Sequence, residues 1–220
     1  MKICTLCPRM CAVDRKSGER GICGQTTEIK VARAALHFWE EPCISGEMGS
    51  GAVFFSGCAL HCVFCQNENI ANGTAGKVIS TERLGEIFLE LQEKGANNIN
   101  LVTPGQFVPQ IIKAVELARN QNLKIPIVYN TSSYENVDTI RSLEGIVDIY
   151  LPDFKYFDTA LSAKYSHAPD YPAVAKAVIA EMVRQTGAAV FENGEDSLMK
   201  RGTIVRHLIL PGCTKDSKAV

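Results

Sequence analysis

Short apolar runs alternate with amphipathic stretches along most of the chain from residue 51 onward. Uninterrupted apolar runs are typical of buried strands, and they predict strands at 52–55, 99–102, 127–129, 146–151 and 204–210. Between them, apolar residues recur at helical spacing, which predicts helices over 80–95, 109–118, 137–143 and 173–186. Strands that alternate with amphipathic helices predict parallel βαβ units, so we expect an α/β fold.

The order of these elements fits two architectures. One is a doubly wound sheet and the other is a partial or full β/α barrel, and periodicity does not separate them. Both architectures place their chemistry at the carboxyl ends of the parallel strands. The polar residues that follow the predicted strands are Cys58, Thr103, Asn130, Thr131, Ser132, Asp153 and Lys155. We therefore expect the functional site at this edge of the sheet.

The two ends of the chain lack this regularity. Residues 1–50 contain scattered Gly, Pro and Cys, so we expect a Cys-rich N-terminal extension that needs a metal or the rest of the protein to fold. The regular pattern over 51–220 predicts a single α/β domain. Asn193-Gly194 predicts a turn. The pair Asp216-Ser217 is typical of a helix start, yet the chain stops soon after it, so we expect a domain truncated after its fifth strand.

Composition and charge narrow the functional classes. Hydrophobic residues make up 46% and charged residues 21% of the 220 residues, which excludes a disordered chain. A formal net charge of -1 gives no clear nucleic-acid signal, and no apolar run approaches the roughly 20 residues of a membrane span. The N-terminus has no apolar signal-peptide core. We therefore expect a cytoplasmic protein without membrane partners.

Three of the nine cysteines form a three-cysteine loop over 58–65, with the spacing C-x3-C-x2-C at Cys58, Cys62 and Cys65. An odd number of cysteines without an export signal favours metal binding or chemistry over disulfides. Three thiolates on one tight loop fit three corners of a cubane iron–sulfur cluster. A structural zinc site needs a fourth ligand, and His61 adjoins a ligand already counted. A cluster of buried free thiols, or a zinc knuckle that borrows a distant ligand, is the alternative.

The three-cysteine loop and its flanks resemble the radical SAM superfamily. Phe64 gives the loop the form C-x3-C-x-aromatic-C directly after an apolar strand, and residues 54–58 and 65–67 resemble the flanks in enzymes related to the pyruvate formate-lyase activating enzyme. The resemblance covers most of residues 50–217. It implies a partial (β/α)6-type barrel, a [4Fe-4S] cluster held by the three cysteines, and S-adenosyl-L-methionine (SAM) at the open iron.

The resemblance also implies a reaction. SAM is reductively cleaved to a 5′-deoxyadenosyl radical that abstracts a hydrogen atom, and the electron comes from a one-electron donor such as flavodoxin or ferredoxin. In activating enzymes the hydrogen belongs to a glycine of a partner enzyme, so a protein substrate is expected. The sequence assigns no catalytic residue. The alternative is a non-catalytic iron–sulfur protein that acts in electron transfer or as a scaffold.

Further cofactor contacts follow from the resemblance and not from the spacing. They are Phe64, Thr103, Asn130, Thr131, Asp153 and Lys155. Lys155 is expected to pair with the methionine carboxylate of SAM. Many relatives carry Gly-Gly-Glu-Pro after the second strand, where it contacts the methionine amino group, but this chain has Thr103-Pro104-Gly105-Gln106 without the acid. Either Thr103 and backbone carbonyls replace it, or SAM binds differently. Arg206 and His207 lie on the predicted fifth strand.

The N-terminal extension holds two further groups of candidate residues. Four cysteines lie close together in sequence, and their thiolates suit zinc or an accessory iron–sulfur cluster equally well: Cys4, Cys7, Cys11 and Cys23. Free cysteines are the alternative for this set. Near residue 40, two interpretations are open for His37, Trp39, Glu40 and Glu41. One is contact with the barrel entrance; the other, which we expect, is a buried aromatic at Trp39 beside a solvated acidic pair, Glu40 and Glu41.

Overall fold

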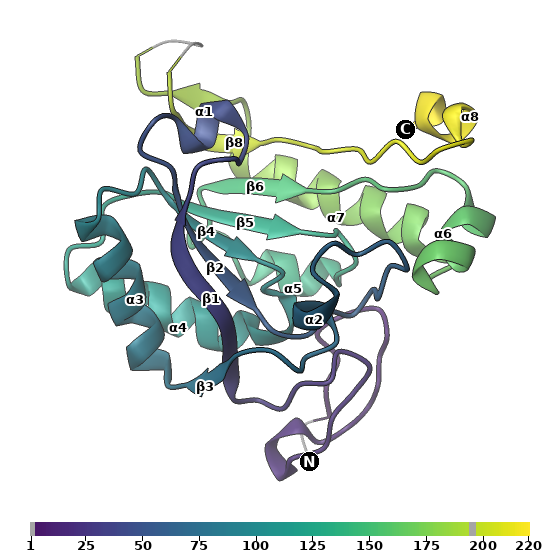
Figure 1. Cartoon of the computed structure of the whole chain (residues 1–220), viewed down its shortest axis with the longest axis horizontal. Helices are drawn as coiled ribbons and strands as arrows, with labels where there is room; N and C mark the ends of the chain where they lie inside the picture. The colour runs from purple at the N-terminus through teal and green to yellow at the C-terminus, as the bar shows by residue number, and fades with distance from the viewer. Residues whose placement is uncertain (1–2, 194–196) are drawn as a thin grey trace.

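An eight-stranded, mostly parallel sheet runs through the computed structural model, which describes residues 3–193 and 197–220 (Figure 1). The strand order is β3-β1-β2-β4-β5-β6-β8-β7, and the neighbours from β2 to β8 are parallel. The remaining pairs are antiparallel. The strands are β1 (Ile29–His37), β2 (Ser50–Phe55), β3 (Lys77–Ile79), β4 (Ile99–Val102), β5 (Ile127–Thr131), β6 (Ile149–Pro152), β7 (Val190–Phe191) and β8 (Met199–Thr203). The predicted α/β fold is confirmed.

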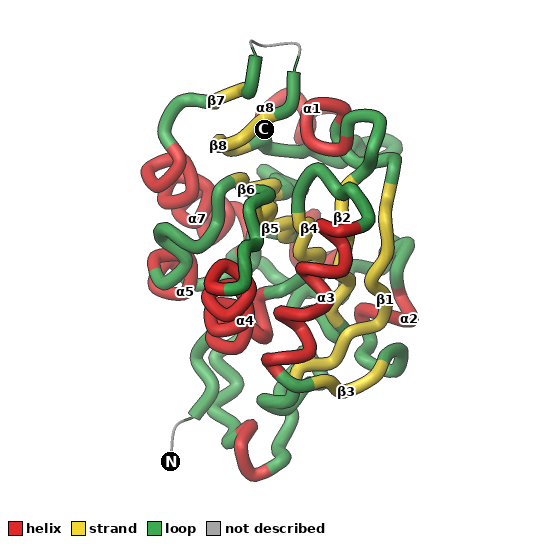
Figure 2. The backbone as a smooth tube through the Cα atoms, turned by 90° about the vertical axis from the view of Figure 1, so that its left-hand side faces the viewer, coloured by secondary structure: helices red, strands yellow, loops and turns green. Residues whose placement is uncertain are grey.

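Four helices cover one face of the sheet, namely α3, α4, α5 and α7 (Figures 1 and 2). Other helices lie at the ends of the strands. The bounds are α1 (Pro42–Ser45), α2 (Glu68–Ala71), α3 (Thr81–Glu93), α4 (Val108–Asn120), α5 (Val137–Arg141), α6 (Thr159–Ser166), α7 (Tyr171–Thr186) and α8 (Thr214–Ala219). No helix in the described ranges is long and apolar enough to cross a membrane.

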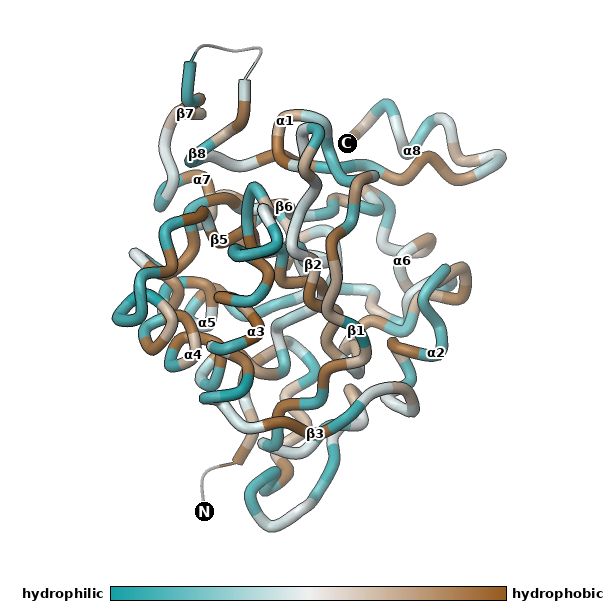
Figure 3. The backbone as a smooth tube through the Cα atoms, turned by 60° about the vertical axis from the view of Figure 1, so that its left-hand side comes forward, coloured by the Kyte–Doolittle hydropathy of each residue, from teal (hydrophilic) through white to brown (hydrophobic). Residues whose placement is uncertain are grey.

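The central strands are apolar because both of their faces are buried. In β5, Ile127 and Tyr129 pack in the main core beneath the helices, whereas Val128 packs on the opposite face with Ile149 of β6. A strand buried on both sides needs a continuous apolar run, which explains why the sequence pattern predicts β2, β4 and β5 correctly. Hydrophobic segments accordingly concentrate around β2 and β5 in the middle of the molecule (Figure 3).

The helix predictions are confirmed at α3, α4, α5 and α7. Ser80 caps α3 by accepting a hydrogen bond from the backbone N–H of Arg83, and Gly95 follows its end with a positive φ of 87°. The pattern misses α6, because this helix has no apolar stripe along one side. Asp158 begins α6 by accepting hydrogen bonds from the backbone N–H groups of Ala160 and Leu161.

Three predictions that concern the strands or the segment before them need correction. The expected extension over 1–50 contributes β1 to the sheet, where it pairs with β2 and β3. The sixth strand in chain order begins at Ile149 and not at residue 146. The predicted strand at 204–210 is wrong, because the last parallel strand is β8.

Within the described residues, the segment after β8 makes one isolated bridge, between Asp153 and Arg206. Its apolar side chains find no partner strand, and Ile209 is 70% exposed. This hydrophobic stretch runs along the outside of the molecule toward α8 (Figure 3). Asn193 of the predicted turn is described, whereas Gly194 lies outside the described residues.

The first part of the chain packs against the end of the sheet near β2 and β4. Arg15 is 5% exposed, and its guanidinium donates to the carbonyl oxygens of Gln25 and Gln106 at 3.1 and 2.8 Å. Gly57 has a positive φ of 87°, and a Cβ there would collide with the carbonyl oxygen of Cys23 and lie 2.6 Å from Cγ of Gln25. The N-terminal cysteines are therefore held close to the start of the three-cysteine loop.

We expect Gly57→Ala to lower the free energy of unfolding by about 3 kcal/mol or more, because it adds a steric collision to the roughly 1–2 kcal/mol of left-handed backbone strain. Gly145 is a matched control, since it has a positive φ of 77° and nothing within 4 Å of the added Cβ. Anaerobic denaturant unfolding followed by circular dichroism measures both variants. Equal losses in the two variants would show that the collision at Gly57 has no energetic weight.

Candidate functional site

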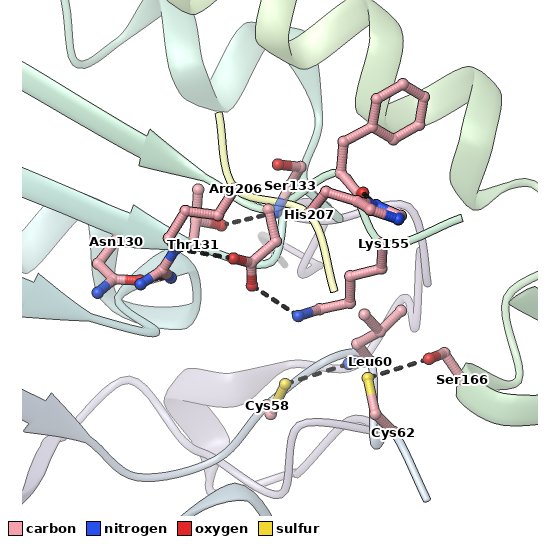
Figure 4. A network of polar contacts seen from close by, with 12 residues as sticks. Cys58, Leu60, Cys62, Asn130, Thr131, Ser133, Lys155, Ser166, Arg206 and His207 are labelled. Atoms are coloured by element: carbon pink, nitrogen blue, oxygen red, sulfur yellow. Dashed lines mark hydrogen bonds and ion pairs between the residues drawn. The ribbon is translucent and has the colours of Figure 1, made fainter. Parts of the chain in front are cut away.

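The carboxyl ends of the parallel strands bring the expected site residues to one edge of the sheet (Figure 4). The backbone N–H of Thr103 donates to the carbonyl of Asn130, and that of Asp153 donates to the carbonyl of Thr131, both at 2.9 Å. Lys155 lies within electrostatic reach of the thiols of the three-cysteine loop. The structure therefore confirms that these residues meet, whereas their roles as cofactor ligands stay predictions.

The three-cysteine loop follows β2 and is held by hydrogen bonds to its sulfurs and its backbone. The backbone N–H of Leu60 donates to Sγ of Cys58 at 3.4 Å, and the hydroxyl of Ser166 donates to Sγ of Cys62 at 3.0 Å. Phe64 packs in the apolar cluster around the loop, with its ring centroid 6.4 Å from that of Tyr156. The sulfur of Cys62 is therefore hydrogen-bonded to α6, whereas the bond to Cys58 comes from within the loop.

The chemistry of the thiols in the three-cysteine loop favours cluster binding over action as hydrolytic nucleophiles or as redox-active thiols. Burial raises the pKa of Cys58 and of Cys62 above the ordinary thiol value, so both free thiols keep their protons at neutral pH. A cluster iron replaces those protons, and the hydrogen bonds from Leu60 and Ser166 favour the resulting thiolates. Among the described residues, no three His, Cys, Asp or Glu side chains are placed to ligate one metal ion. A cubane does not require such convergence, because each thiolate binds a different iron.

A network of four charged side chains lies beside the three-cysteine loop. Oδ2 of Asp153 lies 2.6 Å from Nζ of Lys155, and Oδ1 of Asp153 lies 3.0 Å from Nε of Arg206. Arg206 also contacts Oε1 of Glu40 at 3.0 Å and donates to Oδ1 of Asn130 at 2.6 Å. The two carboxylates and two cations neutralise one another, which allows all four to be largely buried. Arg206 thereby links the segment after β8 to β5, to the β6 end and to the segment after β1.

The expectation for residues 39–41 is wrong at two positions. Glu40 is not solvated, because its side chain is 11% exposed and accepts hydrogen bonds from Asn100 and Asn130 besides its contact with Arg206. Trp39 is not buried but 89% exposed. The residues alternate in direction after β1, so the acid points inward to the cation while the aromatic ring points outward.

Glu135 is a buried acid that the sequence interpretation does not include. Its side chain is buried behind the end of β5 and accepts hydrogen bonds from the hydroxyls of Tyr129, at 2.7 Å, and Thr131. Burial raises the pKa of Glu135 above the ordinary carboxyl value, and the two hydroxyls partly offset this effect. A Cβ on Gly105 would lie 3.0 Å from Oε2 of Glu135, so only glycine leaves the carboxylate its present room. An acid thus stands beside the segment 103–106, where the motif itself lacks one.

Three non-glycine residues at this edge have positive φ. They are His61 at 52°, Thr103 at 55° and Ser133 at 64°. Such conformations cost about 1–3 kcal/mol each and persist where the surrounding structure imposes them, often at functional sites. Their concentration on the three-cysteine loop and on the turns after β4 and β5 supports a functional role for this edge.

A cavity joins the N-terminal cysteines to the site. Its lining includes Cys4, Cys7, Cys23, Cys58, Thr103, Gly105, Thr131 and Glu135. Burial, with smaller contributions from neighbouring thiols, raises the pKa of Cys7 to about 12. Cys11 lies within electrostatic reach of Cys7 and Cys23, and its Sγ accepts the backbone N–H of Ile22 at 3.4 Å. The structure thus gathers the four cysteines, and the second metal centre stays a prediction.

His207 presents an open hydrogen-bond acceptor at the same edge. Its Nδ1 lies 2.7 Å from the carbonyl oxygen of Phe154, so Nδ1 carries the proton and Nε2 holds a free lone pair. Nε2 is buried and has no hydrogen-bond partner among the described residues. A buried acceptor without a partner is costly, so Nε2 is available to a donor on water or on a bound molecule.

Two comparisons with known proteins bear on this site. The family model described as "Radical SAM superfamily" matches residues 52–191, which is more than half of the chain. A protein of Methanocaldococcus jannaschii, named "Uncharacterized protein MJ0674", is 27% identical over 217 residues. The match covers 96% of this chain but 57% of that relative, so the chain spans less than two thirds of the relative's length.

We expect Arg206→Ala to lower the free energy of unfolding by about 2–4 kcal/mol, because Glu40 then remains buried without a cation. Arg83→Ala is the control, since Arg83 and its ion-pair partners Glu86 and Glu90 are all about half exposed, and such pairs contribute about 0–1 kcal/mol. Denaturant unfolding measures both losses. A loss for Arg206→Ala no larger than that of the control would contradict the proposed role of the network.

Proposed function

The chain belongs to the radical SAM superfamily of enzymes, and we propose that it uses a [4Fe-4S] cluster to cleave SAM reductively into methionine and a 5′-deoxyadenosyl radical that abstracts a hydrogen atom from a substrate. The observation that carries this proposal is the placement of the three-cysteine loop beside a charged strand edge with an open buried acceptor. The cluster and SAM supply the radical chemistry when bound. The side chains of this chain bind, orient and shield them.

Cys58, Cys62 and Cys65 would hold the cluster. Three protein thiolates would leave one iron without a protein ligand, and Thr103, Asn130 and Asp153 would supply polar groups for SAM at the same edge of the sheet. The apolar cluster around the loop, which includes Leu60 and Tyr156, limits the access of water to it. Exclusion of water protects reactive intermediates from side reactions. A partial (β/α)6-type barrel is the architecture that the proposal expects around this edge.

Opposite charges at the edge match the two ends of the methionine group of SAM. Lys155 lies within electrostatic reach of the thiols of Cys58 and Cys62, and its ammonium suits the carboxylate of SAM. Glu135 suits the ammonium of SAM, because it is an acid in the cavity wall whose hydrogen-bond partners among the described residues are hydroxyl groups and include no cation. Three polar groups then remain to bind hydroxyl groups of SAM. They are Nε2 of His207 and the side chains of Asn130 and Thr131. In this proposal Glu135 replaces the glutamate that the segment 103–106 lacks.

The partners belong to the same proposal. The electron would come from a one-electron carrier such as flavodoxin or ferredoxin, and the substrate would be a glycine of a partner protein. The free thiol state of all nine cysteines, which lie within the described residues, is compatible with a reducing cytoplasm. Cys4, Cys7 and Cys23 line the same cavity, which is the observation behind a second metal centre with zinc or iron–sulfur as its content, and zinc would require these side chains to converge further than they do among the described residues.

Low-temperature EPR of the anaerobically reconstituted, dithionite-reduced protein tests the function. We expect a cubane signal that changes shape when SAM is added, and we expect Cys58→Ala, Cys62→Ala and Cys65→Ala each to abolish it. Cys43→Ala is the control, because Cys43 lies in α1 away from the three-cysteine loop. A cubane signal indifferent to SAM would favour the electron-transfer alternative, and the absence of any cubane signal would refute the cluster.

We expect Glu135→Gln to weaken SAM binding by roughly 10- to 100-fold, the value of one charge-assisted hydrogen bond in a buried site. The ionised acid binds the ammonium, so wild-type affinity should fall as the pH falls toward the raised pKa of Glu135. In Glu135→Gln this dependence should vanish. Equilibrium dialysis of SAM across pH measures both effects.

Glu181→Gln is the matched control, since Glu181 is also a buried glutamate but lies on α7 and pairs with Arg184. An affinity and a pH profile in Glu135→Gln equal to those of the control would remove Glu135 from the SAM site.

A further inference from the structure

A chain of two hydroxyl groups leads from the protein interior to one sulfur of the three-cysteine loop. The hydroxyl of Ser166 lies 3.0 Å from Sγ of Cys62 (Figure 4). The hydroxyl of Tyr156 lies 2.6 Å from Oγ of Ser166. Ser166 and Tyr156 are both fully buried. Nothing in the fold requires polar side chains here, because the surrounding cluster of Leu60, Phe154 and Tyr171 is apolar or aromatic.

The direction of the hydrogen bonds follows from the number of protons. Ser166 has one hydroxyl proton, and it donates this proton to Sγ of Cys62. Its oxygen can then only accept from Tyr156, so both hydroxyl dipoles point toward the sulfur. Hydrogen bonds in such a series polarise one another, and a buried site strengthens them further. The chain therefore presents concentrated positive potential to Cys62.

The backbone holds this donor in place independently of the sulfur. Ser166 is the last residue of α6, and its carbonyl accepts a hydrogen bond from Arg9 at 3.2 Å. The neighbouring carbonyl of Tyr165 accepts the backbone N–H of Val63 at 2.9 Å. The end of α6 and the three-cysteine loop are thus joined by a second bond one residue away from the first. Ser166 is positioned before any cluster is bound.

We propose that Ser166, polarised by Tyr156, is a positioning residue that raises the reduction potential of the cluster held by Cys58, Cys62 and Cys65. The inference rests on the proposed function, because it assumes that a cluster binds there. Reduction adds one electron from an external donor and makes the cluster more negative, while no covalent bond in the protein forms or breaks. A donor to a cluster sulfur stabilises the reduced state more than the oxidised state.

Cys62 is singled out by this arrangement. Cys58 receives the backbone N–H of Leu60, which no side-chain substitution removes. Within the described residues, Ser166 is the one side chain that donates a hydrogen bond to these three sulfurs. It is thus the bond through which a change of one side chain can adjust the potential without altering a ligand.

Potentiometric titration of the reconstituted full chain, followed by the EPR signal of the reduced cluster, tests the inference. We expect Ser166→Ala to lower the equilibrium constant for one-electron reduction by about tenfold, which corresponds to a potential about 59 mV more negative. Tyr156→Phe should shift the potential in the same direction by less, because Ser166 keeps its proton. Ser166→Thr retains the hydroxyl and should stay close to the wild type.

Ser162→Ala is the matched control. Ser162 is a fully buried serine one turn earlier on α6, and its hydroxyl bonds to the carbonyl of Thr159 and not to a cysteine. We expect no change of potential in this variant.

The two proposals fail in different ways. If the wild type forms no cubane cluster, the proposed function fails, and this inference fails with it. If the wild type forms the cluster but Ser166→Ala has the potential of Ser162→Ala, only the inference is overturned. If Ser166→Ala does not assemble a cluster, Tyr156→Phe decides, and an unchanged potential in that variant overturns the inference.

Discussion

The position of the site depends on one constraint. The central strands pair in parallel, and they end at the same height in the sheet. Phe54 of β2, Val102 of β4, Asn130 of β5 and Leu151 of β6 are successive partners across the sheet. Strands that end in one line deliver their next residues to one edge. Each strand can carry a site residue only because burial on both faces holds its register, since a slip by one residue would turn every side chain to the other face. The buried apolar core thereby sets the geometry of a polar site.

Charge neutralisation is the second requirement at this edge. Asp153, Lys155, Arg206 and Glu40 form a neutral set, and removal from water is tolerable only while the set is complete. Glu135 stands outside this set, with hydroxyl groups and no cation as its hydrogen-bond partners. The asymmetry matters, because a balanced network is satisfied by itself, whereas a lone buried acid gains most from a positively charged ligand.

The sequence predicts those parts of the fold and site that depend on local spacing. The strand runs at 52–55 and 99–102 and the three-cysteine loop are local patterns, so they could be recognised without the fold. The run at 204–210 is also local, but whether an apolar run pairs depends on a partner strand, and this segment has only the bridge at Arg206. Contacts such as Glu40 with Arg206 join residues 166 positions apart, and no local pattern encodes them.

Under the proposed function, the position of Glu135 offers a way to replace the acid that the segment 103–106 lacks. A binding site requires a carboxylate at a point in space, and the chain can deliver one from the turn after β5 as readily as from the segment after β4. The two routes compete for the same volume, since Gly105 lacks the Cβ that would crowd the carboxylate of Glu135. The absence of an acid from the segment 103–106 and the presence of Gly105 in it therefore both leave room for the carboxylate of Glu135. The sequence alone does not reveal this arrangement, because it depends on the ends of β4 and β5 lying side by side.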